Sequence, residues 1–189
     1  MGKQNDELIG TAVIVVDMIN AYLRKGEPQY CAECWSIVEN VRVLLEHFRS
    51  HGGAVVFCNT QLKSSHDPMA RKWGMHAVIG TDSCKVIDEL GPVRNDVVCG
   101  KRSYNGFFQT NLNSILQRRK ITGVVVCGIH THACVLLTAA AALDYGFEVV
   151  VLEDCMTTSF RGNHSSRLRF FGSHIGTVST LADFLKHSS

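Results

Sequence analysis

Three residues of the sequence have side chains that together suit nucleophilic catalysis. They are a carboxylic acid, Asp17, an amine, Lys101, and a thiol, Cys134. Asp17 and Lys101 each come just after a short apolar run, and Cys134 follows a similar run by way of a loop that begins at Gly128. A carboxylate accepts a proton from a thiol, an ammonium stabilises the thiolate, and a thiolate is a strong nucleophile. The three residue types therefore indicate a cysteine nucleophile with its base and its charge-stabilising partner.

The loop from Gly128 to Cys134 leads directly into a predicted helix, so Cys134 is expected near a helix N-terminus. Free N–H groups and the helix dipole favour an anion there, so we expect a lowered pKa for this thiol. His130 and His132 flank the nucleophile, and a Cys–His pair is an alternative, although we interpret both as loop histidines at the pocket rim. The structural alternatives are a helix N-cap for Asp17, a surface lysine for Lys101 and a buried inert thiol for Cys134.

Five short apolar runs predict the strands that must position these side chains. Each run is continuous and rich in β-branched residues, which indicates strands buried on both faces, as in a parallel sheet. The runs cover residues 12–16, 54–58, 97–99, 124–127 and 149–152, and a weaker sixth covers 174–178.

Helical patterns of apolar residues fill the intervals between these runs. They cover residues 34–50, 110–119, 133–145, 165–171 and 181–186. The alternation predicts right-handed βαβ crossovers and a doubly wound α/β sheet, in which ligands bind beyond the carboxyl ends of the strands. Residues 61–91 are interpreted as a long, partly irregular insertion with a functional role. We predict a single domain over residues 1–189, with a core from about 11 to 185.

The charge balance and the first residues of the sequence limit the partners and the cellular compartment that we expect for the protein. The 19 Lys and Arg residues nearly balance the 17 Asp and Glu residues, which argues against a nucleic-acid partner. The first residues, Met1 to Asp6, are polar, and the first apolar run is too short for a signal peptide or a membrane span. We therefore expect a cytoplasmic protein with reduced thiols and no membrane partner.

The eight cysteines do not predict a disulfide framework. Cys58, Cys99 and Cys127 lie in apolar runs and are expected to be buried in the core, and Cys84 and Cys155 have no assigned role. Cys31 and Cys34 have the spacing of half a zinc site, but a second Cys/His pair at suitable spacing is missing from the sequence. A thioredoxin-like redox motif is also disfavoured, because a long segment separates the pair from the first predicted strand.

Four ordered motifs resemble those of the isochorismatase-like cysteine hydrolases, a family that includes nicotinamidases, N-carbamoylsarcosine amidase and ureidoacrylate or biuret-type amidohydrolases. The resemblance covers the chain from about Thr11 to Leu185. The motifs are Val13 to Asn20 around Asp17, Trp73 to Thr81, Gly100 to Phe107 around Lys101, and Gly128 to Val135 followed by Thr138 and Ala139.

The resemblance implies a three-layer α/β/α fold with a six-stranded parallel sheet. It also implies a catalytic triad of Asp17, Lys101 and Cys134, and a cis peptide between Ile129 and His130. The backbone N–H groups of His130 and Cys134 would then form an oxyanion hole. The implied activity is hydrolysis of the C–N bond of a small amide, carbamoyl or ureido compound through a thioester.

Two other branches of the family remain as alternatives. Nicotinamidases of this family bind a divalent metal with an Asp-x-His motif after the second strand, where this chain has Gln61-Leu62-Lys63. A protonated lysine is not a ligand and glutamine is a poor one, so we expect no metal and no other cofactor. His76 matches a third ligand position and His66 lies nearby, which leaves a remnant site as the alternative to a hydrogen-bonded loop histidine. An isochorismatase-type hydrolase is the other branch, but its chemistry does not need the cysteine.

The substrate-binding residues are predicted with less specific signals. Arg71, Trp73 and Tyr104 are expected to shape the pocket, and Arg71 or Arg161 is expected to bind a substrate carboxylate through its planar guanidinium. Relatives assemble into rings or smaller oligomers, so a homo-oligomer, either a dimer or a tetramer, is expected. The alternative outside enzymes is a catalytically silent oligomeric binding or scaffold protein of the same fold, and the intact set of Asp17, Lys101 and Cys134 argues against it.

Overall fold

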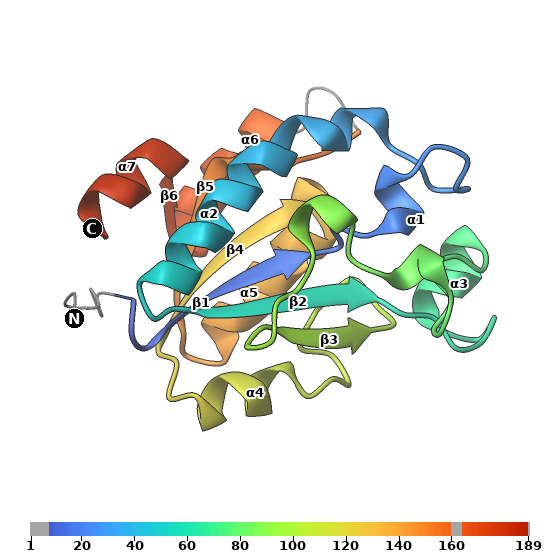
Figure 1. The fold of residues 1–189 in the computed structure, drawn as a ribbon, viewed down its shortest axis with the longest axis horizontal. Helices are drawn as coiled ribbons and strands as arrows, with labels where there is room; N and C mark the ends of the chain where they lie inside the picture. Colours follow the sequence, from blue (N-terminus) through green and yellow to red (C-terminus); the bar gives the residue numbers. More distant parts are fainter. Residues whose placement is uncertain (1–7, 160–163, 189) are drawn as a thin grey trace.

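A six-stranded sheet forms the centre of the protein. The computed structural model describes residues 8–159 and 164–188. All strand pairs are parallel, in the spatial order β3-β2-β1-β4-β5-β6 (Figure 1). The strands are β1 Thr11–Val16, β2 Ala54–Thr60, β3 Val97–Lys101, β4 Gly123–Ile129, β5 Glu148–Thr157 and β6 Thr177–Ser179. The predicted doubly wound parallel sheet is therefore confirmed, with its strand order reversing between β1 and β4.

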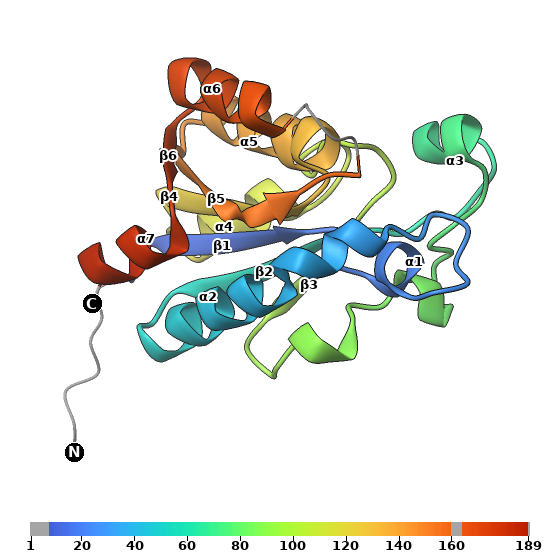
Figure 2. The same cartoon turned by 90° about the horizontal axis from the view of Figure 1, so that it is seen from above.

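Helices cover both faces of this sheet. Figure 2 shows α2 and α7 on one side and α5 and α6 on the other, which confirms the predicted three layers. The α-helices are α1 Asn20–Leu23, α2 Val38–Ser50, α3 Pro68–Trp73, α4 Leu112–Arg118, α5 Leu136–Asp144, α6 His164–His174 and α7 Leu181–His187. Short 3₁₀ segments occupy η1 Ala32–Ile37, η2 Asp82–Cys84 and η3 Asp88–Leu90, and η4 Thr131–Val135 is a π-helical turn. Within the described residues, no helix is long and apolar enough to cross a membrane.

The central strand β1 shows why its sequence is continuously apolar. Val13 and Val15 belong to the core that contains the buried face of α2. Ile14 and Val16 belong to the opposite core, which contains the buried faces of α4 and α5. Because successive side chains of a strand point to opposite faces, a strand covered on both sides needs apolar residues at every position.

The structure differs from the sequence prediction at several element boundaries, among them the end of β5, which reaches Thr157 rather than residue 152. The last strand begins at Thr177 rather than 174, because α6 continues to His174. The chain then turns at Gly176, where a Cβ would collide with the backbone of Val149. The predicted helix at 34–50 begins as the 3₁₀ segment η1, and the one at 133–145 begins as the π-helical turn η4. The predicted insertion at 61–91 contains α3, η2 and η3 and no strand of the sheet.

Strands β1 and β4 leave no room for a side chain at Gly128, where the candidate site begins. Gly128 pairs with Val16 and has a φ of +107°. A Cβ at Gly128 would collide with the carbonyl oxygen of Val16. Glycine is therefore required here both by backbone conformation and by the close approach of two backbones.

We expect Gly128→Ala to lower the free energy of unfolding by more than about 2 kcal/mol, since it adds a steric collision to the conformational penalty. Gly146→Ala is the matched control, because Gly146 has a φ of +85° and nothing lies within 4 Å of its added Cβ. The control carries only the conformational penalty, about 1–2 kcal/mol. Urea denaturation measures both variants, and equal losses would contradict the role of crowding at Gly128.

Candidate active site

Asp17 and Lys101 form an ion pair that is removed from solvent. The Lys101 Nζ atom lies 2.7 Å from Asp17 Oδ2, and the two side chains are 0% and 2% exposed. Asp17 directly follows β1, and Lys101 is the last residue of β3. Strand β2 lies between these two strands, so the extended lysine side chain crosses the end of β2 to reach the carboxylate.

Thr60, the last residue of β2, binds both members of the pair. Its backbone N–H and its hydroxyl donate hydrogen bonds to Asp17 Oδ1 over 2.7 and 2.9 Å. Its hydroxyl oxygen accepts a hydrogen bond from Lys101 Nζ at 2.9 Å. Thr60 was not among the predicted site residues, although it follows the predicted strand 54–58 by two positions and lies at the same edge of the sheet as Asp17 and Lys101.

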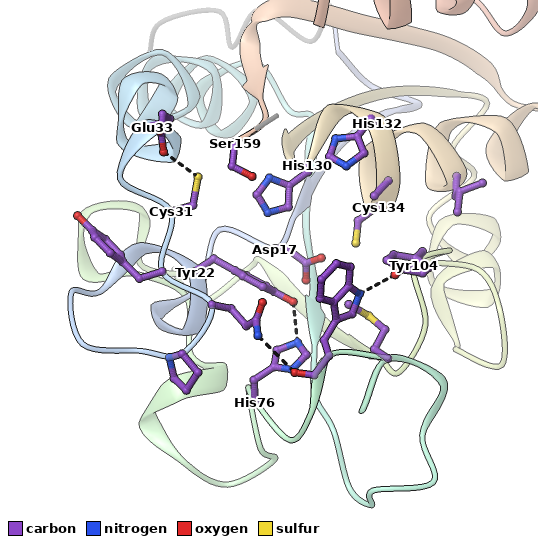
Figure 3. Close-up of a pocket in the computed structure, with 17 residues that line it drawn as sticks. Asp17, Tyr22, Cys31, Glu33, His76, Tyr104, His130, His132, Cys134 and Ser159 are labelled. Atoms are coloured by element: carbon purple, nitrogen blue, oxygen red, sulfur yellow. Dashed lines mark hydrogen bonds between the residues drawn. The ribbon is translucent and has the colours of Figure 1, made fainter. Parts of the chain in front are cut away.

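Cys134 joins this pair from the turn after β4. Its sulfur accepts a hydrogen bond from Lys101 Nζ at 3.4 Å, and the residue is 4% exposed. The structure thus brings together all three residues that the sequence analysis singled out for catalysis. Figure 3 shows the Cys134 sulfur and the Asp17 carboxylate reaching into the same pocket.

The backbone has uncommon conformations at two places in this cluster, at Asp17 and just before His130. Asp17 has a φ of +56°, a left-handed conformation that aspartate tolerates better than most residues. On the other side, the peptide between Ile129 and His130 is cis, as the family resemblance implies. The His130 carbonyl then accepts hydrogen bonds from the N–H groups of Ala133 and Val135, which holds the turn that carries Cys134.

The Cys134 thiol is less acidic than the sequence analysis predicts. Burial raises its pKa above the ordinary value, the charge of Asp17 raises it further, and the ammonium of Lys101 only partly opposes both effects. The prediction of a lowered pKa was wrong because it considered the helix N-terminus and not the depth of the thiol or the adjacent carboxylate. Burial is the largest single influence on the pKa of Lys101 and lowers it, but the charges of Asp17 and of the other acidic groups around the amine together outweigh burial. The net shift of the Lys101 pKa is therefore upward, and the amine stays protonated.

A pocket of about 490 Å³ opens above this cluster. Its described lining contains no arginine or lysine and consists largely of aromatic, histidine and apolar residues, among them Tyr22, Met69, Trp73, Tyr104 and Leu137. The Trp73 indole N–H donates a 2.6 Å hydrogen bond to the Tyr104 hydroxyl, which joins two walls of the pocket. Trp73 and Tyr104 therefore lie where the sequence analysis predicts.

The two predicted arginines have different outcomes. Arg71 is exposed on α3 and does not line the pocket, so the structure does not support its predicted role. The reason is helical geometry, since Met69 and Trp73 are four residues apart and share the face of α3 that meets the pocket, whereas Arg71 lies between them in sequence. Arg161 lies outside the described residues.

His76 is a hydrogen-bonded loop histidine, which confirms that interpretation of it. Its Nδ1 lies 2.9 Å from the Gly74 carbonyl and its Nε2 lies 3.0 Å from the Tyr22 hydroxyl. A carbonyl only accepts, so Nδ1 carries the proton and the Tyr22 hydroxyl donates to Nε2. Both ring nitrogens of His76 are thus engaged by groups of the protein.

Comparison with known proteins identifies a family with this fold. Residues 11–183 match the isochorismatase domain. The chain belongs to the isochorismatase family. The crystal structure of N-carbamoylsarcosine amidase from Thermoplasma acidophilum is similar, with a TM-score of 0.82 and 34% identity over 90% of this chain and 96% of that one.

Two curated relatives extend this comparison. An uncharacterized isochorismatase family protein of Bacillus subtilis, YwoC, is 29% identical over 191 residues, which cover 98% of each chain. The maleamate amidohydrolase of Pseudomonas putida is 25% identical over 181 residues, which cover 93% of this chain and 85% of the relative. The chain is accordingly an isochorismatase-family hydrolase.

The acidity of Cys134 gives a test by alkylation. We expect iodoacetamide to label Cys134 slowly at pH 7 and faster as the pH rises, because the raised pKa keeps the thiol protonated. Asp17→Asn removes a charge that raises this pKa, so it should speed labelling at pH 8. Mass spectrometry of the labelled peptide measures the rate, and Cys134→Ala identifies the signal. Slower labelling in Asp17→Asn would contradict the charge effect.

The buried ion pair gives a test by stability. Lys101→Met leaves the Asp17 carboxylate buried without its counterion, and we expect the free energy of unfolding to fall by about 3–5 kcal/mol. The double variant Asp17→Asn/Lys101→Met carries no unpaired charge and should recover part of this loss. Urea denaturation measures both, and a double variant that is as unstable as the single one would exclude charge burial as the cause.

Proposed function

We propose that this isochorismatase-family hydrolase is a cysteine-dependent amidohydrolase, cleaving the C–N bond of a small amide, carbamoyl or ureido compound. The observation that carries the proposal is the contact of Lys101 with both Asp17 and Cys134 beneath a pocket that admits a small molecule. The similarity to proteins named as an amidase and an amidohydrolase supports the same reaction class.

The proposed reaction begins with a proton transfer. Asp17 takes the proton of Cys134, and Lys101 stabilises the thiolate through the hydrogen bond that it donates to the sulfur. The thiolate attacks the carbonyl carbon of the substrate. The backbone N–H groups of His130 and Cys134 are proposed to hold the developing oxyanion, a contribution of about 3 kcal/mol per donor.

The remaining steps return the site to its starting state. Protonated Asp17 gives its proton to the leaving nitrogen, which departs as ammonia or an amine and leaves a thioester on Cys134. Asp17 then takes a proton from water as the water attacks the thioester. The acid product leaves, and the proton returns to the sulfur. The reaction consumes one water for each substrate molecule that is hydrolysed.

The pocket lining supports a substrate with a flat or apolar part. Trp73 and Tyr104 are proposed as substrate-binding residues, because both line the pocket and a hydrogen bond from the Trp73 indole to the Tyr104 hydroxyl holds their aromatic rings in place. A cytoplasmic location is part of the proposal, since the nucleophile must stay reduced and all eight cysteines are free thiols. Assembly into a dimer or tetramer is also proposed.

A screen of small amides, ureides and carbamoyl compounds, with ammonia release as the readout, tests this function. We expect turnover of at least one such compound and a loss of at least about 10³-fold in Cys134→Ala, which lacks the nucleophile. Cys84→Ser is the matched control, because Cys84 is buried outside the pocket and a serine hydroxyl keeps a donor for the Thr81 carbonyl. Activity that survives in Cys134→Ala would exclude the thioester route and favour an isochorismatase-type reaction, and turnover confined to nicotinamide would favour a nicotinamidase.

A further inference from the structure

Two further cysteines lie at the side of the pocket and have no part in the proposed reaction. Cys31 is the N-cap of η1 and Cys34 lies within that segment. Both are buried, and their sulfur atoms are 2.6 Å apart. Two thiols so close together indicate a shared partner or a bond rather than ordinary core packing.

An imidazole from a distant part of the chain completes this group. His130, in the turn after β4, places its Nδ1 atom 3.9 Å from the Cys34 sulfur. Among the described residues, the ligand atoms of Cys31, Cys34 and His130 all lie within 4.8 Å of one another. One of the two ligands that the Cys31–Cys34 motif lacks is therefore supplied by His130, which is 96 positions from Cys34 in the sequence.

We propose that Cys31, Cys34 and His130 bind a zinc ion at the side of the pocket. Two thiolates and a neutral imidazole are preferred zinc ligands, and three protein ligands with a fourth open position are typical of an accessible zinc site. Binding releases the two thiol protons, so the ion and its two thiolates carry no net charge. This neutrality reduces the penalty for burying the ion beside the core.

The geometry requires one adjustment. A tetrahedral zinc with Zn–S of about 2.3 Å and Zn–N of about 2.0 Å separates sulfur from nitrogen by roughly 3.6 Å and the two sulfurs by roughly 3.8 Å. The observed distance of 3.9 Å between the Cys34 sulfur and His130 Nδ1 exceeds the first value by only about 0.3 Å. The sulfurs must move apart by about 1 Å, which small rotations of the two cysteine side chains provide. A disulfide is the competing state, but it would leave the placement of the imidazole unexplained.

The fourth position faces the pocket. Cys31, Glu33 and His130 all line the pocket, and Figure 3 shows them together on one side of it. Glu33 Oε2 lies 3.6 Å from the Cys31 sulfur, so this carboxylate is near enough to occupy the fourth position when no other oxygen does, and the site then carries one net negative charge at the edge of the pocket. A substrate oxygen can take its place. This last role rests on the proposed function, whereas the zinc site itself does not.

The set shares no residue with the positions at which nicotinamidases bind their metal. Those positions correspond to Gln61, Lys63 and His76, and both ring nitrogens of His76 are already engaged. The proposed ion also lies beside His130, whose backbone N–H is a proposed oxyanion donor. A zinc ion bound to the His130 side chain would restrict the movement of this residue. The zinc site would thereby also help to position the backbone N–H of His130.

Zinc content tests the proposal without any substrate. The reduced protein is freed of metal with a chelator, loaded with zinc, passed through a desalting column and analysed by inductively coupled plasma mass spectrometry. We expect about one zinc per chain, and at least tenfold weaker zinc binding in Cys31→Ser, Cys34→Ser and His130→Asn. Cys84→Ser and Cys134→Ala should bind zinc like the unaltered chain.

Cobalt provides a readout that does not depend on any variant. Cobalt(II) in a tetrahedral site with two thiolates gives strong sulfur-to-metal charge-transfer absorption in the near ultraviolet and visible d–d bands, and we expect both in the unaltered chain. Absence of these bands, or zinc binding that persists in Cys31→Ser, would overturn the proposal. A zinc-free reduced protein whose oxidised form has two fewer titratable thiols would identify a redox pair instead. Cys134→Ala lacks the proposed nucleophile but keeps all three proposed zinc ligands. Zinc binding by this variant therefore tests the zinc site independently of the proposed hydrolysis.

Discussion

A carboxylate and an ammonium, both withdrawn from water, impose the strictest requirement on this structure. Each ion alone would carry a penalty of several kcal/mol, so the fold must keep Asp17 and Lys101 in contact. The two residues sit on strands separated by β2, a span of about 10 Å. The lysine side chain, the aspartate side chain and the 2.7 Å contact between them together bridge that span, and Thr60 at the end of β2 forms hydrogen bonds with both groups. Three neighbouring strands are thereby fixed in register at the edge where the pocket opens.

The same burial determines how the thiol reacts. At rest the cluster contains one negative charge on Asp17, one positive charge on Lys101 and a neutral Cys134. Moving the proton from sulfur to carboxylate keeps the total charge of the cluster constant. The low polarity of the surroundings therefore opposes this transfer much less than it would oppose loss of the proton to solvent. The raised pKa keeps the resting thiol protonated, and a protonated thiol reacts slowly with electrophiles.

The sequence predicted those features that depend on local pattern. Continuous apolar runs predicted the strands, since a strand that is covered on both faces, such as β1, needs apolar residues at every position. The polar residues that follow these runs predicted Asp17, Lys101 and Cys134 as site residues. The role of Thr60 was not predicted, because a threonine near the end of a strand is common and has no distinctive sequence pattern. The depth of Cys134, the helix face of Arg71 and the meeting of His130 with Cys34 depend on tertiary packing, and no local pattern encodes them. The start of β6 was predicted too early because Ile175 is an apolar residue of the core and not part of a strand.

The reactive groups and the pocket walls come from different classes of segment. Asp17, Thr60 and Lys101 lie at the carboxyl ends of three neighbouring strands of the sheet, whereas Trp73, Tyr104 and Glu33 lie on short helices and connections. Substitutions in those connections can reshape the pocket while the buried sheet stays unchanged. Substrate specificity can therefore evolve separately from the catalytic chemistry in this fold. In protein design, the residues that line the pocket can be varied while the residues of the core are kept.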